Sequence, residues 1–305
     1  MNNQIKAGKL SKLLFSFTLL GLMSFTANAN ELNGTLAKIK ESGVIVVGHR
    51  ESSIPFSYYD NEQNIVGYSQ DYSNLIVEAV KKELNMPDLQ VKYLPVTSKT
   101  RIQLLNNYTY DFECGSTTNN LDRQKFVDFS NTIYIIGTRF LVKQDSDIND
   151  ITDLKGKNVA TTAGTTSEIR LNQINNKEKL GIRIVTPKDH GDAFNALETG
   201  RVAAFLMDDA LLAGERSRAI NPSEWKIVGK PLSYEAYACM IRKDDPQFKQ
   251  LVDKTIAEAQ TSGKALESYN RWFTQPVPPK NANMELEISP KMLELFSAPN
   301  DNALD

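Results

Sequence analysis

Apolar residues occur along the chain in two kinds of run, short β-branched stretches and longer segments of helical period. Val44 to Val47 is a short stretch of the first kind, and residues 68–84 carry apolar side chains at helical spacing, as at Leu75, Ile76 and Val80. The two kinds alternate, which predicts an α/β fold with largely parallel sheets flanked by helices. The expected strands are 44–48, 89–94, 110–115, 159–162, 182–185 and 202–206, and the expected helices are 36–41, 68–84, 100–106, 166–174, 192–199, 208–216, 247–261 and a further one ending at 273.

Two longer extended runs, residues 133–142 and 234–241, enclose a self-contained block of strands and helices. This pattern predicts a chain that leaves its first domain, builds a second and returns. We therefore expect lobe 1 to comprise 30–136 and 238–305, lobe 2 to comprise 137–237, and two hinge strands to join them beside a cleft. The proline-rich tail after Gln275 should pack on lobe 1 by its apolar residues or fray.

The first 29 residues have the pattern of a secretory signal peptide. Lys6, Lys9 and Lys12 precede an apolar stretch, 13–25, that is short for a membrane span, and Ala27 to Ala29 fits a cleavage site. An uncleaved anchor is the alternative. Cleavage after Ala29 would leave 276 residues with 32 basic and 37 acidic side chains. Neither that balance nor any basic run with aromatic residues favours nucleic acid.

The chain contains two cysteines, Cys114 and Cys239, each in an expected strand. In an exported protein such a pair is a disulfide candidate, and two buried free thiols are the alternative. The cysteines and the two histidines, His49 and His190, lack metal-ligand spacing, so we expect neither a metal nor another cofactor.

The segment from Asp111 to Arg123 ends an expected strand in small hydroxyl residues. Ser116 and Thr118 offer hydroxyls and amides where a helix is expected to begin, and Arg123 offers a planar fork of donors that matches a carboxylate. A strand followed by a capped helix with a surface arginine would have the same sequence. Other segments must therefore decide whether this one binds a carboxylate.

Ligands bind at the carboxyl ends of strands in open α/β sheets, and polar groups gather at those positions. Taken singly, each could be a surface charge or a helix cap. Together, three arginines and one aspartate sum to +2, which suits a dicarboxylic amino acid of charge −1. The candidate ligand-binding residues are Arg50, Ser98, Arg101, Ser116, Thr118, Arg123, Thr166, His190 and Asp208.

Enzyme motifs do not accompany this pattern. The sequence contains no G-x-S-x-G, Walker A or H-E-x-x-H motif, so we expect no catalytic residues. Asp111 and Glu113 would share one face of a strand, which leaves a paired-carboxylate acid/base interpretation open.

These residues resemble the periplasmic solute-binding proteins of amino-acid ABC transporters, bacterial solute-binding protein family 3. The resemblance covers essentially all of the chain after the leader. It is most specific at Gly48 to Tyr58, Asp111 to Arg123, Gly164 to Glu168, Lys188 to Asp192 and Met207 to Arg216. It implies a two-lobed type II periplasmic-binding fold that closes around its ligand.

The resemblance also implies roles for the candidate residues. Arg123, Ser116 or Thr118, and Thr166 would hold an α-carboxylate, and Asp208 with a nearby hydroxyl or carbonyl would hold an α-ammonium. A distal carboxylate would be held by Arg50, Ser98, Arg101 and His190. The implied ligand is L-glutamate or L-aspartate, and the implied partner of this periplasmic monomer is an inner-membrane ABC permease. An exported enzyme on the same fold, similar to cyclic-acid dehydratases, and a ligand-sensing module are the alternatives.

Overall fold

The computed structural model describes residues 1–2 and 31–304. Nearly all of the predicted signal peptide, residues 1–29, lies outside that part. Residues 32–304 belong to one compact unit. Within the described residues, no helix is both long and apolar enough to cross a membrane. The helices are α1 (Gly34–Ser42), α2 (Tyr68–Glu83), α3 (Arg101–Asn106), α4 (Thr166–Glu178), α5 (His190–Glu198), α6 (Asp209–Ser217), α7 (Pro246–Thr261), α8 (Lys264–Phe273) and α9 (Pro290–Ser297).

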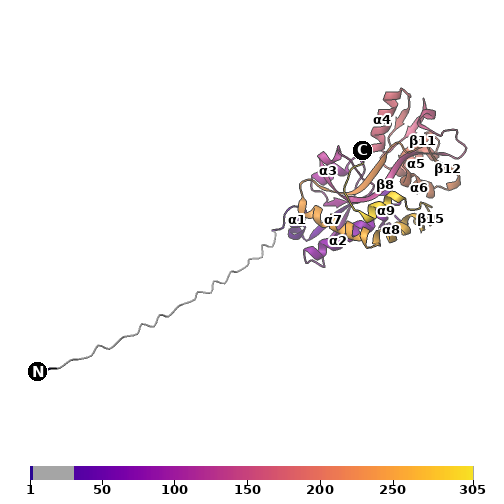
Figure 1. Ribbon diagram of the computed structural model, residues 1–305. Coiled ribbons are helices and arrows are strands. Elements are labelled where there is room, and N and C mark those ends of the chain that lie inside the picture. The colour runs from indigo at the N-terminus through magenta and orange to yellow at the C-terminus, as the bar shows by residue number, and fades with distance from the viewer. Residues whose placement is uncertain (3–30, 305) are drawn as a thin grey trace. The chain divides into compact units, whose positions relative to one another are not determined.

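Two groups of strands share one hydrogen-bonded path in the order β10-β9-β11-β8-β13-β6-β1-β5. We call β5, β1, β6, β7 and β13, with α1–α3 and α7–α9, the first half, and β9–β12 with α4–α6 the second half (Figure 1). The strands are β1 (Val44–His49), β5 (Gln90–Pro95), β6 (Phe112–Glu113), β7 (Thr118–Asn119), β8 (Val127–Lys143), β9 (Asn158–Ala160), β10 (Arg183–Val185), β11 (Ala204–Asp208), β12 (Trp225–Val228) and β13 (Tyr234–Arg242).

The long strand β8 belongs to both halves. Between Val127 and Gly137 it pairs antiparallel with β13, and from Thr138 to Lys143 it pairs antiparallel with β11 and β12. Away from these crossing strands, β1 is parallel to β5 and β6, and β9 is parallel to β10 and β11. The sheets are therefore mixed, with the predicted parallel pairs on either side and the two long extended runs crossing between the halves.

Apolar side chains from both faces of these sheets form the core. Strand β1 buries Ile45 and Val47 against α2, whose apolar stripe includes Ile76 and Val80. In the second half, Phe140 of β8 and its neighbours pack beneath α4. Burial of alternate strand positions against amphipathic helices explains why the hydrophobic pattern predicts these elements.

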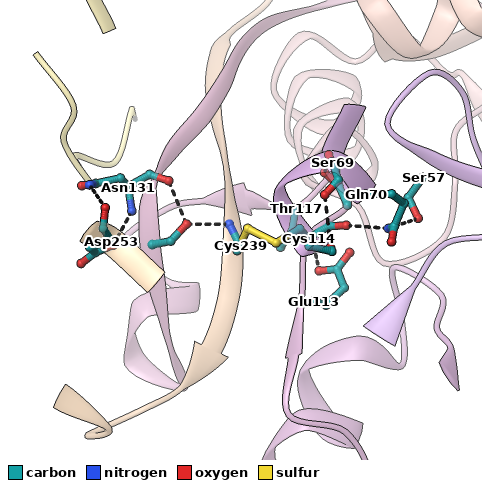
Figure 2. The surroundings of a disulfide bond; sticks show 12 residues. Ser57, Ser69, Gln70, Glu113, Cys114, Thr117, Asn131, Cys239 and Asp253 are labelled. Atoms are coloured by element: carbon teal, nitrogen blue, oxygen red, sulfur yellow. Dashed lines mark hydrogen bonds between the residues drawn. A yellow bond between two sulfur atoms is a disulfide. The ribbon is translucent and has the colours of Figure 1, made fainter. Parts of the chain in front are cut away.

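A disulfide links two distant segments of the chain that both lie in the first half of the fold. Cys114, immediately after β6, is bonded to Cys239, within β13, as Figure 2 shows. Both cysteines are fully buried. The predicted bridge is thus confirmed, and the free-thiol alternative is not. Cys114 stands just outside its strand because β6 is shorter than the expected 110–115.

The helix expected to begin near Thr118 is absent. Residues 118–119 form β7, which pairs with Ala236 and Tyr237 of β13, and only a single 3₁₀ turn (Arg123–Lys125) follows. Pairing with a distant strand outweighs the local capping signal here. Sequence patterns also missed short strands, β2 (Ser52–Ser53), β3 (Ser57–Tyr59), β4 (Ile65–Val66), β14 (Pro276–Val277) and β15 (Ala282–Asn283), and the 3₁₀ turns Ile151–Leu154 and Pro222–Glu224.

The tail packs on the first half. Helix α9 buries Met292, Leu295 and Phe296 against α7 and β8. Beyond it, the carbonyl of Asn300 accepts a hydrogen bond from the Thr132 amide at 2.8 Å. The tail therefore packs by its apolar residues, as expected, and does not fray over this stretch.

Candidate functional site

The carboxyl ends of strands from both halves face one another, and the candidate residues stand there. In the first half, Arg50 follows β1, Ser98 and Arg101 follow β5, and Ser116 and Thr118 follow β6. In the second half, α4 starts at Thr166 after β9, α5 starts at His190 after β10, and β11 ends at Asp208. All of these side chains are buried except that of Thr166, which is half-buried, as is Arg123 on its 3₁₀ turn.

Two arginines occupy one end of this cleft. Arg50 donates from Nη1 to Ser116 Oγ at 3.3 Å, and Arg101 donates from Nη1 to the Ser116 carbonyl at 3.2 Å and to Thr117 Oγ1. Thr117 in turn donates to Glu113 Oε2 at 2.7 Å. Burial, together with Arg101, lowers the pKa of Arg50 to about 10, so this guanidinium remains cationic at neutral pH.

His190 lies at the same end. Its Nδ1 is 2.7 Å from Thr162 Oγ1, and burial, with Arg50 and Arg101 adding to it, holds its pKa well below 6.5. The imidazole is therefore neutral. Within residues 31–304, no protein partner bonds His190 Nε2, Arg101 Nε or Ser98 Oγ, although all three atoms are buried. Unpaired buried polar groups are costly, so this end of the cleft is suited to a ligand rich in hydrogen-bond acceptors.

The other end combines an arginine with acidic groups. Arg123 donates from Nη1 to the Thr118 carbonyl at 2.9 Å and from Nη2 to the Gly164 carbonyl, across the cleft, at 3.5 Å. Burial and Arg101 lower its pKa to about 9. Asp208 accepts from Thr138 Oγ1 at 3.2 Å and from the Tyr237 hydroxyl. Burial and then the charge of Glu235 raise the pKa of Asp208.

Two glutamates belong to this cleft that sequence reasoning did not place there. Glu113 is fully buried beside Arg101 and Arg50, and Glu235 is buried between Thr118 and Thr166. The +2 sum over three arginines and one aspartate therefore left two buried acidic side chains of the cleft out of account. Arg50 and Arg101 lie with Glu113 at one end of the cleft, and Asp208 lies with Glu235 at the other.

The paired-carboxylate interpretation of Asp111 and Glu113 finds no support. Asp111 forms ion pairs with Lys38 at 2.7 Å and Arg242 at 3.0 Å, and its Oδ2 accepts from the Val46 amide at 2.9 Å. These bonds fix β1 to its neighbours, whereas Glu113 lies beside Arg101. The described residues also hold no group of three or more His, Cys, Asp or Glu side chains arranged for a metal ion.

Glycines let the main chains of the two halves approach closely across the cleft. A Cβ on Gly164 (φ +78°) would lie 2.6 Å from Lys99 Cα, and one on Gly214 would lie 2.7 Å from the Ile54 carbonyl carbon. On the Arg123 side, a cavity of about 410 Å³ borders the cleft, with Thr118, Thr166 and Glu235 in its wall. The surfaces of the two halves that face each other across the cleft are thus in contact at these glycines.

A cleft of buried charges between two α/β halves, crossed by two long strands, defines a ligand-binding protein with the type II periplasmic-binding fold. The chain belongs to the bacterial extracellular solute-binding proteins, family 3, whose family model matches residues 45–275.

Individual relatives agree with this assignment. The chain is 60% identical over 97% of its length to the glutamate/aspartate import solute-binding protein of Salmonella typhimurium, which is covered completely. It is 51% identical to the L-glutamate/L-aspartate-binding protein of Pseudomonas aeruginosa, over 96% of this chain and 97% of that one. Among solved structures, a mutant of ArgBP from T. maritima matches with a TM-score of 0.70 and 28% identity, covering 78% of this chain and 99% of that one.

Proposed function

We propose that this protein captures L-glutamate and L-aspartate in the cleft and delivers them to an ABC importer. The observation that carries the proposal is the buried cluster of Arg50, Arg101 and His190, in which Arg101 Nε and His190 Nε2 have no partner among residues 31–304. The side-chain carboxylate of a ligand supplies two charged acceptor oxygens for these donors. A side-chain amide, as in glutamine, supplies a single acceptor oxygen and carries no charge. The names of the relatives support the same ligands.

In the proposed complex, the two ends of the cleft bind the two ends of the amino acid. Arg50, Ser98, Arg101 and His190 hold the distal carboxylate. Arg123 holds the α-carboxylate and Asp208 the α-ammonium, with Ser116, Thr118 and Thr166 around them. A carboxylate bound by an arginine fork gains two charge-assisted hydrogen bonds, and a micromolar dissociation constant requires about 8 kcal/mol in total.

The proposal includes the lobes and the setting. Lobe 1 would comprise 30–136 and 238–305 and lobe 2 would comprise 137–237, and the change of partner along β8 after Gly137 supports a boundary there. We infer a periplasmic monomer, released by cleavage after Ala29, that an inner-membrane permease recognises when the lobes are closed. It would bind its ligand without converting it.

Calorimetry of ligand-stripped protein with glutamate, aspartate, glutamine and arginine tests the proposal. We expect binding of both acidic amino acids and a strong preference over the other two, and Arg123→Ala should abolish binding. Failure to bind either acid would overturn the proposal. NMR of the ligand after incubation addresses the enzyme alternative, because a binding protein returns it unchanged. Uptake by vesicles carrying the permease separates transport from sensing.

A further inference from the structure

Glu235 connects the two halves at the cleft through a single carboxylate oxygen. It lies on the crossing strand β13, and only 3% of its surface is exposed. Its Oε2 accepts from Thr118 Oγ1 of the first half at 2.5 Å and from Thr166 Oγ1 of the second half at 2.7 Å. Its Oε1 accepts from Ser233 Oγ at 3.3 Å. Each hydroxyl in this group has a partner.

These bonds determine which way the two threonine hydroxyls point their hydrogens. An ionised carboxylate can only accept, so Thr118 and Thr166 must both donate to it. A hydroxyl has one hydrogen, and once that hydrogen is committed only lone pairs remain for a ligand. Thr118 and Thr166 therefore present acceptors to the cleft, next to Asp208, whose carboxylate is also an acceptor.

Acceptors of this kind repel a carboxylate and attract an ammonium group. The α-carboxylate does not need the threonine hydroxyls, because Arg123 lies on the same side of the cleft and offers it a cationic fork of donors. The resemblance assigned Thr166, and either Ser116 or Thr118, to the α-carboxylate, and an unspecified nearby hydroxyl or carbonyl to the α-ammonium beside Asp208. With Glu235 in place, the two threonine oxygens suit the α-ammonium, and Arg123 with main-chain amides is left for the α-carboxylate.

We propose that Glu235 is a positioning residue that makes Thr118 and Thr166 hydrogen-bond acceptors, and so makes this end of the cleft select an α-ammonium group. The inference rests on the proposed function, since it concerns how the same cleft tells an amino acid from an acid without the amino group. Selection for the ammonium group would then rest on the oxygens of Thr118 and Thr166, which Glu235 orients, together with the carboxyl of Asp208.

The test compares L-glutamate with (S)-2-hydroxyglutarate, in which a hydroxyl replaces the ammonium group, by calorimetry at one pH. Wild-type protein should bind glutamate far more tightly. In Glu235→Gln the side-chain NH₂ can donate to the threonines, which frees their hydrogens, and the ratio of the two dissociation constants should fall at least tenfold. Thr118→Val/Thr166→Val should lower the same ratio.

Glu113→Gln is the matched control, because it also removes one buried carboxylate, but at the Arg101 end. It should alter the preference for glutamate over glutamine and leave the ammonium ratio within about twofold. Equal weakening of both ligands by Glu235→Gln, or an unchanged ratio, would overturn the proposal, because a purely structural role predicts those results. If wild-type protein binds no glutamate at all, the proposed function fails first and the two failures remain distinct.

Discussion

Reduction of the Cys114–Cys239 disulfide should cost this protein much of its stability and little of its ligand affinity. The bridge spans a sequence separation of 125 residues, which includes the whole second half. For a loop of that size, the chain-entropy relation says that the bridge lowers the entropy of the unfolded chain by about 17 cal/mol/K. This corresponds to a stabilisation of the folded protein by about 5 kcal/mol at 25 °C, which reduction would remove. A typical domain has only about 5 to 15 kcal/mol in total.

The local structure around Cys114 explains why affinity should survive. The carbonyl of Cys114 accepts from Gln70 Nε2 at 3.2 Å, and the carbonyl of Gly115 accepts from Ser69 Oγ at 2.8 Å (Figure 2). Helix α2 therefore holds the segment that leads to Ser116 whether or not the bridge is intact. We expect the dissociation constant for glutamate to change by less than about threefold.

Urea unfolding in the presence and absence of a reductant measures the first quantity, and calorimetry on the folded, reduced protein measures the second. Trp272 on α8 and Trp225 on β12 place one fluorescent reporter in each half. Cys114→Ala/Cys239→Ala serves as the control for effects of the reductant itself. A loss of unfolding free energy below about 1 kcal/mol would refute the entropic reasoning, and a large loss of affinity in folded protein would refute the independence of the site.

Three further predictions concern the cleft and its supports. Arg101→Ala should remove most of the preference for glutamate over glutamine while keeping binding measurable; titration with both ligands decides, and an unchanged preference would contradict the assignment of Arg101 to the distal carboxylate. Gly214→Ala should weaken ligand binding at least tenfold without lowering the melting temperature, because the added Cβ would lie 2.7 Å from the Ile54 carbonyl carbon and hinder closure; X-ray scattering with and without ligand should show less compaction than in wild type. Burial raises the pKa of Glu215 to about 7 despite its ion pair with Arg218, so the folded protein holds this proton above the pH at which the unfolded chain releases it, and stability should fall by about 3 kcal/mol as pH rises from 4.5 to 7; Glu215→Gln should flatten that part of the stability profile, and an equal slope in the variant would count against it.

The layered fold and the convergence of most candidate residues were predictable because both depend on local patterns. Apolar runs and helical spacing specify the strands and helices, and the carboxyl ends of parallel strands meet at one edge, which brings Arg50, Arg101 and Ser116 together. Glu235 could not be placed in this way. Its contact with Thr118 joins residues 117 positions apart and depends on the register of β7 with β13, which no local pattern reports.

The same register explains the helix that was expected and is not there. Residues after Gly115 have the composition of a helix start, but the main chain at Thr118 and Asn119 is engaged by β13. Sequence patterns also did not place Glu113 in the cleft, because it has the appearance of an ordinary strand residue until its bond to Thr117 is seen. Contacts between distant residues, rather than local helix propensity, decide both the missing helix and the position of Glu113.

The strand β8 makes the two halves a single mechanical linkage. One uninterrupted backbone carries the ladder of the first sheet up to Gly137 and that of the second from Thr138 onward. A rotation of one half against the other must be taken up by torsion at this changeover and in the segment that returns into β13, and the two lie close together, because a Cβ on Gly137 would lie 3.0 Å from Pro231 Cβ. The two connections therefore act as one hinge, in which torsion of β8 at Gly137 cannot proceed without moving the neighbouring Pro231.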